Sequence, residues 1–174
     1  STIERDERHN RKDMIHPTAC IHPGAQIDPS VEVGPFCVIE DGVVIGPRCR
    51  LWPHVHVTGL TTIGAGNQFH TGSVIGNIPQ DLKFKGEQTR LVIGRRNIFR
   101  EFVTIHRGTH GGGGLTIIGD RNVFMAYAHV AHDCHIGNFT IFGNAATLGG
   151  HVTVEDYATI SAFSGVHQFC RVGQ

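Results

Sequence analysis

The sequence predicts an all-β fold, a three-sided parallel β-helix built from hexapeptide repeats. Three observations predict it: a large apolar residue recurs every six positions, a small residue often follows four places later, and Pro or Gly often stands between the two. A period of six fits neither an amphipathic helix nor a hairpin strand. It is typical of a β-helix, in which each hexapeptide contributes one short strand and one corner.

The large apolar residue defines the register of the repeat. The series starts at Ile15 and runs unbroken to Ile75, returns at Ile93, and after a one-residue slip resumes at Ile118. We expect these side chains to fill the interior of the β-helix. The complete series is Ile15, Ile21, Ile27, Val33, Ile39, Ile45, Leu51, Val57, Ile63, Phe69, Ile75, Ile93, Phe99, Ile105, Ile118, Phe124, Val130, Ile136, Phe142, Leu148, Val154, Ile160, Val166 and Val172.

The other places of the hexapeptide carry further signals. Small residues such as Ala19, Cys37 and Ala128 stand four places after the large one, where we expect them to point inward. Proline stands two places after it, as at Pro17 and Pro23, where we expect a corner. Three hexapeptides then close one coil of about eighteen residues, and the coils should stack about 4.8 Å apart.

We expect a charged, disordered tail over residues 1–13 and one β-helix domain over residues 14–174, incomplete at its C-terminal end. Two segments interrupt the register and should leave the wall as loops. Residues 76–92 place Asp81 where a core residue would fall, and residues 106–117 contain four consecutive glycines and the one-residue slip. In a rigid solenoid, such loops usually serve binding.

Composition excludes several classes of function. Fifteen basic and fifteen acidic residues cancel, so no global charge favours a nucleic acid partner. No apolar run reaches the roughly eighteen residues that a membrane helix needs, so we expect no membrane insertion. Residues 1–13 lack the apolar stretch of a secretory signal, and we expect a cytoplasmic protein.

The positions of the cysteines indicate a structural role. Cys37, Cys49, Cys134 and Cys170 occupy the small inward place of the hexapeptide, and Cys20 falls one place later. We therefore expect small buried residues rather than a disulfide framework, which agrees with a reducing compartment. The inward place of Cys134 argues against a thiol nucleophile, although histidines adjoin it.

Residues 128–135, AHVAHDCH, are the strongest candidate for chemistry. His132 and Asp133 fall at a corner, where side chains can point away from the interior. A carboxylate beside a histidine holds one tautomer of the ring and raises its basicity. The pair is therefore a candidate general base.

The coil length gives this pair a neighbour. Adding eighteen to His132 reaches Gly150, whose N–H a substrate can approach closely, as an oxyanion site requires. His129 reaches no such glycine, so we favour His132 as the base. Asp133 reaches His151, which extends the polar strip by one coil.

Two other functions stay open on the residues alone. Some trimeric β-helix enzymes, the gamma-class carbonic anhydrases, bind zinc through three histidines. His129 and His135 lie six residues apart, hence on different walls, and could share such a metal only between chains. The other possibility is a non-catalytic β-helix scaffold. We expect no metal and no cofactor.

Five longer motifs go beyond the repeat: NIPQDLKFKGE at 77–87, VTIHRGT at 103–109, AHVAHDC at 128–134, NAATLGGHV at 144–152 and GVHQFC at 165–170. Through them the chain closely resembles the acyl-carrier-protein-dependent UDP-N-acetylglucosamine O-acyltransferases, a family of hexapeptide-repeat acyltransferases. A generic hexapeptide acetyltransferase shares the repeat but not this set of motifs. The resemblance implies that the β-helix is left-handed.

The resemblance also implies roles for individual residues. His132 would be the general base, Asp133 its orienting partner and the Gly150 N–H the oxyanion donor. A Gln-Asp-x-Lys segment of the family helps to bind the sugar nucleotide. The matching substrate-binding residues are Gln80, Asp81 and Lys83 and, elsewhere in the cleft, His106, His129, His151, His167 and Gln168.

The implied reaction transfers an R-3-hydroxyacyl group from acyl carrier protein to the 3-hydroxyl of UDP-N-acetylglucosamine, the first step of lipid A biosynthesis. No covalent enzyme intermediate is expected. Acyl carrier protein and the sugar nucleotide are thus the expected partners. The family is homotrimeric, with sites between adjacent β-helices, and carries a C-terminal helical domain that this sequence lacks.

A local excess of basic residues agrees with acidic partners. Residues 83–107 contain seven basic residues against two acidic ones. We expect them to form a basic strip near the site that steers the carrier protein and the nucleotide. The basic residues are Lys83, Lys85, Arg90, Arg95, Arg96, Arg100 and Arg107.

Overall fold

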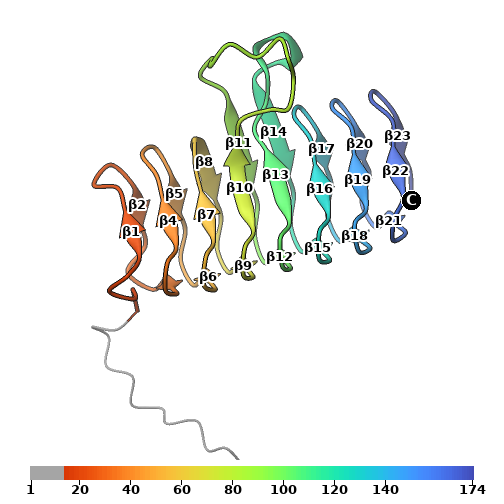
Figure 1. The fold of residues 1–174 in the computed structure, drawn as a ribbon. Coiled ribbons are helices and arrows are strands. Elements are labelled where there is room, and N and C mark those ends of the chain that lie inside the picture. Colours follow the sequence, from red (N-terminus) through yellow and green to blue (C-terminus); the bar gives the residue numbers. More distant parts are fainter. Residues whose placement is uncertain (1–13) are drawn as a thin grey trace, which may run out of the picture.

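A computed structural model describes residues 14–174 as a rod of stacked coils with three walls, each a parallel sheet (Figure 1). The predicted disorder of residues 1–13 concerns residues outside this range. The first sheet contains β1 (Cys20–Ile21), β4 (Val38–Ile39), β7 (His56–Val57), β10 (Val74–Asn77), β13 (Thr104–His106), β16 (His129–Val130), β19 (Thr147–Leu148) and β22 (Gly165–Val166).

The other two sheets have the same construction. The second contains β2 (Gln26–Ile27), β5 (Val44–Ile45), β8 (Leu60–Ile63), β11 (Arg90–Ile93), β14 (Leu115–Ile118), β17 (His135–Ile136), β20 (Thr153–Val154) and β23 (Arg171–Val172). The third contains β3 (Glu32–Val33), β6 (Arg50–Leu51), β9 (Gln68–Phe69), β12 (Ile98–Phe99), β15 (Val123–Phe124), β18 (Ile141–Phe142) and β21 (Thr159–Ile160).

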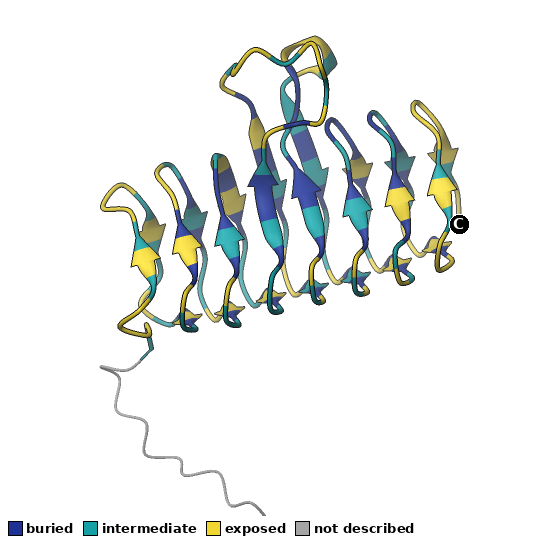
Figure 2. Cartoon of the chain, in the orientation of Figure 1, coloured by how far each residue is buried: buried dark blue, intermediate teal, exposed yellow. Residues whose placement is uncertain are grey.

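Neighbouring strands of each sheet come from successive coils, so the register repeats the predicted period. Cys20 pairs with Val38, and His129 with Thr147. The large apolar residue of every hexapeptide from Val33 to Ile160 is buried. The series is only partly buried in the end coils, and Ile15 is exposed (Figure 2), because an end coil has a neighbour on one side alone.

This end effect corrects one prediction. Cys170 occupies the small place of its hexapeptide but is exposed, because it lies in the last coil. Cys37, Cys49 and Cys134 are buried as predicted, and all five thiols are free. None of the described residues forms a helix with the length and apolarity that crossing a bilayer requires.

The corners follow a turn that places one residue in the left-handed region. Pro precedes that residue at Phe36, Arg48 and His54, which is the arrangement of a type II turn. Non-glycine residues in this conformation cost roughly 1–2 kcal/mol each, so the stacked sheets must hold them there. With φ between 57° and 64°, they are Phe36, Arg48, His54, Arg96, Phe102, Arg121, Tyr127, Asp133, Phe139, Ala145, His151, Tyr157, Phe163 and Phe169.

Two ladders of identical side chains run through the interior of the middle coils. Phe69, Phe99, Phe124 and Phe142 stack with ring centroids 4.6–4.9 Å apart. The spacing equals the distance between neighbouring strands of a sheet, about 4.8 Å, so each ring lies over the ring one coil away.

The second ladder consists of buried asparagines at the small place of the hexapeptide, which the sequence analysis did not identify. Asn67 Oδ1 accepts from the Asn97 N–H at 2.9 Å, and Asn97 Oδ1 accepts from the Asn122 N–H at 2.8 Å. The side-chain amide of Asn97 donates to the Gly119 carbonyl at 2.9 Å. The ladder therefore satisfies corner groups that the sheets leave unpaired.

The two predicted loops leave the same edge of the rod, between the first and second sheets (Figure 1). Both are shorter than predicted. The first covers residues 78–89, because β10 extends to Asn77 and β11 begins at Arg90. The second covers residues 107–114, between β13 and β14, and includes the 3-10 turn η2 (His110–Gly112).

The asparagine ladder gives the first prediction. Asn97→Ala should lower the free energy of unfolding by about 1–3 kcal/mol, because the Asn122 N–H loses its acceptor in a buried place. Urea denaturation followed by circular dichroism measures the change. Asn144→Ala, at an exposed position, is the control and should change it by less than about 0.5 kcal/mol. Equal midpoints for the two variants would contradict this role.

Candidate active site

The candidate site lies at the edge from which both loops leave. His132 and Asp133 form the corner between β16 and β17, and Asp133 has a φ of 59°. The hexapeptide register predicts side chains that can point away from the interior. Both residues are nevertheless buried, with 8% and 6% of their surface exposed. The second loop folds over them, and it is this cover that the repeat pattern could not foresee.

Three donors hold the Asp133 carboxylate. Its Oδ2 lies 2.7 Å from His132 Nδ1 and accepts from the Thr109 hydroxyl at 2.5 Å, and its Oδ1 accepts from the Thr109 N–H at 2.9 Å. The Asp133 N–H donates to the Thr116 hydroxyl at 2.9 Å. The carboxylate is therefore fixed against the ring, with Nδ1 of His132 as the donor nitrogen and Nε2 left as the acceptor.

Two glycines make this close packing possible. A Cβ at Gly112 would lie 2.2 Å from the Asp133 carboxylate, so only glycine lets the second loop approach it. A Cβ at Gly150 would lie 2.5 Å from His132 Cε1 and 2.7 Å from Nε2. The Nε2 side of the imidazole thus faces Gly150, one coil away as the eighteen-residue count predicts. Within residues 14–174 the buried Gly150 N–H has no acceptor.

His129 lies one coil before Gly150, and His106 lies two coils before it on the same side. His106 ends β13 and is 4% exposed, whereas the sequence predicts it at the start of the second loop. Burial, together with the neighbouring His129 and His132, lowers its pKa to about 4. His129 Nδ1 lies 2.7 Å from the Thr104 hydroxyl, and burial lowers its pKa as well. Both rings are therefore neutral at pH 7.

His151 links the buried pair to an open cavity. Its Nε2 lies 3.9 Å from Asp133 Oδ2, and its ring stacks on Phe169 at 4.5 Å. Both residues line a cavity of about 460 Å³ that the two loops enclose. Its lining is Asp81, Lys83, Phe84, Glu87, Thr109, His110, Gly111, Gly112, His151 and Phe169. Of the predicted sugar-nucleotide residues, Asp81 and Lys83 thus reach the same space as His151.

The remaining predicted residues lie around this space rather than in its lining. Gln80 is exposed on the first loop, next to Asp81. His167 and Gln168 are exposed in the last coil, directly before Phe169. Gln168 packs beside Gly149, where a Cβ would meet its side chain at 3.1 Å.

Other candidate chemistries find less support. His132, Asp133 and His151 place three potential metal ligands within 4.8 Å of one another. The Asp133 carboxylate is already engaged by His132 and Thr109. Cys134 points inward, donates to the Gly149 carbonyl, and burial raises its pKa to about 11, so it supplies no thiolate nucleophile.

The predicted basic strip does not exist as one surface. A coil turns through three walls, so basic residues that are close in sequence lie on different edges. Lys83 is on the first loop at the site, Arg95 and Arg96 are on the edge between the second and third sheets, and Arg100 follows β12 on the third. Arg107 remains near the site, where its guanidinium donates to the Gly76 carbonyl and covers the Phe84 ring.

Sequence reasoning missed four residues of the site. Thr109 lies twenty-four residues before Asp133, and no count of coils crosses the second loop to find it. Thr116 lies seventeen residues before Asp133, next to Leu115, the residue that counting back one coil reaches. Phe84 and Phe169 bring apolar surface to the cavity, and nothing in the hexapeptide pattern marks them.

Comparison with known proteins identifies related sequences and structures. The family described as Bacterial transferase hexapeptide (six repeats) matches residues 24–59 and 115–150. An acyl-[acyl-carrier-protein]–UDP-N-acetylglucosamine O-acyltransferase of Stenotrophomonas maltophilia is 57% identical over 159 residues, which are 91% of this chain and 60% of the relative. The chain thus spans about 60% of that relative's length.

Solved structures of acyltransferases also match this chain. A UDP-N-acetylglucosamine acyltransferase matches with a TM-score of 0.91 and 46% identity, over 92% of this chain and 62% of its own. The protein LpxA of Acinetobacter baumannii matches with a TM-score of 0.70 and 36% identity, over 92% of this chain and 67% of its own. With the hexapeptide match, these structures confirm the predicted left-handed β-helix.

The lowered pKa of His106 gives the second prediction. In protein labelled with ¹³C at histidine, the ring resonance of His106 should keep the neutral shift from pH 8 down to pH 5, because burial disfavours the charged form. The signal that disappears in His106→Gln identifies it. A His106 midpoint near 6.5 would refute the assigned burial.

Proposed function

Because the chain belongs to the family of acyl-[acyl-carrier-protein]–UDP-N-acetylglucosamine O-acyltransferases, we propose that it forms the β-helix domain of such an enzyme. The proposed reaction moves an R-3-hydroxyacyl group from acyl carrier protein to the 3-hydroxyl of UDP-N-acetylglucosamine, the first step of lipid A biosynthesis. The observation that carries the proposal is the His132–Asp133 pair, held by Thr109 beside the free N–H of Gly150.

Each proposed step uses an atom whose surroundings are described above. His132 Nε2 accepts the proton of the sugar 3-hydroxyl, and the hydroxyl oxygen attacks the thioester carbonyl carbon. The Asp133 carboxylate stabilises the imidazolium that forms, because it already accepts from Nδ1. The carbon–sulfur bond then breaks, and the leaving thiolate takes the proton from Nε2. No bond to the enzyme forms at any stage.

The Gly150 N–H is the proposed donor to the negative oxygen of the tetrahedral intermediate. A backbone donor without an internal acceptor, next to the base, is preorganised for this task. The glycine also has a second purpose that the sequence analysis did not foresee: any side chain at this position would displace the His132 ring.

The cavity between the two loops is the proposed sugar-nucleotide site. Its volume of about 460 Å³ falls in the range of small-molecule pockets, roughly 300–1,000 Å³. Lys83 supplies a positive charge for the diphosphate, and Asp81 and His151 supply hydrogen-bonding groups. His151 lies next to Asp133. Gln80, His106, His129, His167 and Gln168 are proposed to border the same cleft.

We also propose that the protein is a cytoplasmic homotrimer with sites between adjacent β-helices. Exposed aromatic pairs occupy successive corners, with Phe102 on Tyr127 at 5.5 Å and Phe139 on Tyr157 at 5.0 Å. Leu82, at the tip of the first loop, is fully exposed at 104%. Such apolar surface favours contact with a neighbouring chain, and free thiols suit a reducing compartment.

The third prediction concerns the base. In the full-length protein, His132→Ala should lower kcat by about 10²–10⁴, the usual contribution of a positioned general base. Turnover is measured with a 3-hydroxyacyl carrier protein and UDP-N-acetylglucosamine. Asp133→Ala should lose less, because the ring remains but loses its orienting partner.

His129→Ala is the matched control, a histidine of the same strip without a glycine one coil away, and should lose less than His132→Ala. Circular dichroism should show that all three variants keep the β-helix. Near-normal turnover of His132→Ala together with loss in His129→Ala would assign the base to His129. Full activity in all three would favour a non-catalytic scaffold.

The fourth prediction concerns assembly. Sedimentation equilibrium at micromolar concentration should give the mass of a trimer, because the exposed aromatic corners are then covered. Tyr127→Asp with Tyr157→Asp should weaken the trimer, whereas Asn144→Asp, at an exposed polar position, should leave it intact. A monomer for the unaltered protein would rule out a site that needs two chains.

A further inference from the structure

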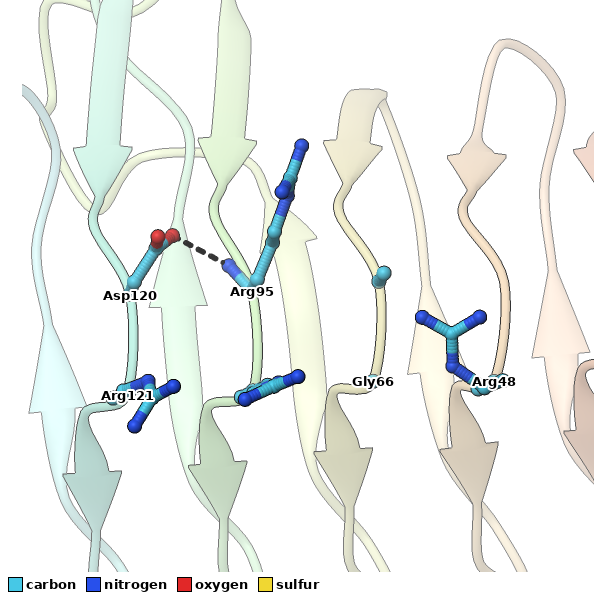
Figure 3. A pocket seen from close by; sticks show the side chains of 7 residues that line it. Arg48, Gly66, Arg95, Asp120 and Arg121 are labelled. Atoms are coloured by element: carbon cyan, nitrogen blue, oxygen red, sulfur yellow. Dashed lines mark hydrogen bonds between the residues drawn. The ribbon is translucent and has the colours of Figure 1, made fainter.

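A second hollow lies on a different edge of the rod, between the second and third sheets. Its volume is about 320 Å³. Figure 3 shows Arg48, Gly66, Arg95, Asp120 and Arg121 on the successive corners that form it. The complete lining is Arg48, Ala65, Gly66, Arg95, Arg96, Asp120 and Arg121.

The hollow exists because one corner in the row has no side chain. Arg48, Arg96 and Arg121 stand at the left-handed place of their corners, with φ of 57–58°. Gly66, with a φ of 72°, holds this place between Arg48 and Arg96. The Arg96 stem leans over it, since a Cβ at Gly66 would lie 3.4 Å from Arg96 Cγ. The missing side chain thus opens a gap between guanidinium groups.

The positive charge of this row exceeds the negative charge beside it, although Asp28, hydrogen-bonded to Ser30, lies close enough to Arg48 for the guanidinium to help lower the pKa of its carboxyl. None of the four guanidinium groups forms an ion pair or a hydrogen bond with the described residues. The one carboxylate in the lining, Asp120, accepts from the Arg95 backbone N–H at 2.7 Å. Arg121 has a partial partner, the Phe139 ring, 5.6 Å from its Cζ.

Neither folding nor packing explains three arginines at the left-handed place of this edge. The left-handed place disfavours any residue with a Cβ, and like charges one coil apart repel at about 4.8 Å. The corresponding corners on the edge between the third and first sheets hold Phe36, His54, Phe102 and Tyr127 instead. The fold therefore accepts uncharged residues at this place, and the arginines need another reason.

We propose that this row of arginines binds an oligophosphate, a ligand with a linear chain of two or more phosphate groups. Guanidinium groups match phosphate oxygens with paired hydrogen bonds and stay charged at any physiological pH. Arg96 and Arg121 lie one coil apart and bind one end of the chain. Arg48 lies two coils from Arg96, across Gly66, and binds the other end.

The site is separate from the proposed sugar-nucleotide cavity. That cavity opens at the loops, on the edge between the first and second sheets, and none of its lining residues lines the hollow. One wall, formed by the second sheet, separates the two edges. The proposal therefore does not depend on the acyltransferase reaction.

The fifth prediction tests this site by isothermal titration calorimetry of the full-length protein with sodium tripolyphosphate. Arg96→Ala with Arg121→Ala should weaken binding at least tenfold, because two of the three aligned guanidinium groups are lost. Arg50→Ala with Arg100→Ala removes the same charge from exposed positions elsewhere and should change binding less than twofold. Equal weakening in both pairs would show non-specific attraction and overturn the proposal.

The length of the phosphate chain supplies a second, independent readout. Arg48→Ala should weaken tripolyphosphate binding but leave diphosphate binding unchanged, because only the longer chain spans the gap at Gly66. Gly66→Asp, a residue that tolerates the left-handed conformation, should weaken binding of both with all arginines present. Absence of tripolyphosphate binding in the unaltered protein would overturn the proposal. Loss of binding in Lys83→Ala would also overturn it, because that result would place the ligand in the cavity between the two loops.

Discussion

The register of the parallel hydrogen bonds between coils is the constraint on which the rest of this molecule depends. Each strand contributes only two to four residues, so no strand is stable without the ones before and after it. The Cys20 N–H donates to the Cys37 carbonyl and the Val38 N–H to the Val55 carbonyl, and the pattern continues along the rod. A slip by one residue would turn core side chains outward. The chain makes its one-residue slip between Ile105 and Ile118, a stretch that includes the second loop. At its start the pairing of β10 with β13 shifts register, because Ile75 pairs with Ile105 but Asn77 pairs with His106.

The same register explains how much could be predicted from the sequence. Because every position repeats its environment after one coil, counting placed the large apolar series in the core and set Gly150 against His132. The count is purely geometric, so it needs no knowledge of side-chain contacts. It works wherever consecutive coils have the same length, which is why the fold and the central pair of the site were predictable together.

Prediction failed where the chain leaves this regularity or where residue type is ambiguous. Thr109 holds Asp133 from a loop whose path depends on glycines and local turns. The asparagines of the interior ladder were overlooked because an amide is polar, and only the unpaired corner carbonyls make its burial favourable. The basic strip was wrong because nearness along the sequence means little in a solenoid, where neighbours in space lie one coil apart and neighbours in sequence turn a corner.

The left-handed corners have a consequence for how such a chain can diverge. A corner side chain leaves the rod, and the cost of its conformation is met by the sheets beside it, so its chemistry can change while the interior stays the same. The corner residues along each of the three edges can therefore vary while the interior of the β-helix stays the same. Mutation can make one edge catalytic, another aromatic and the third cationic, and each can be inherited and refined without the others.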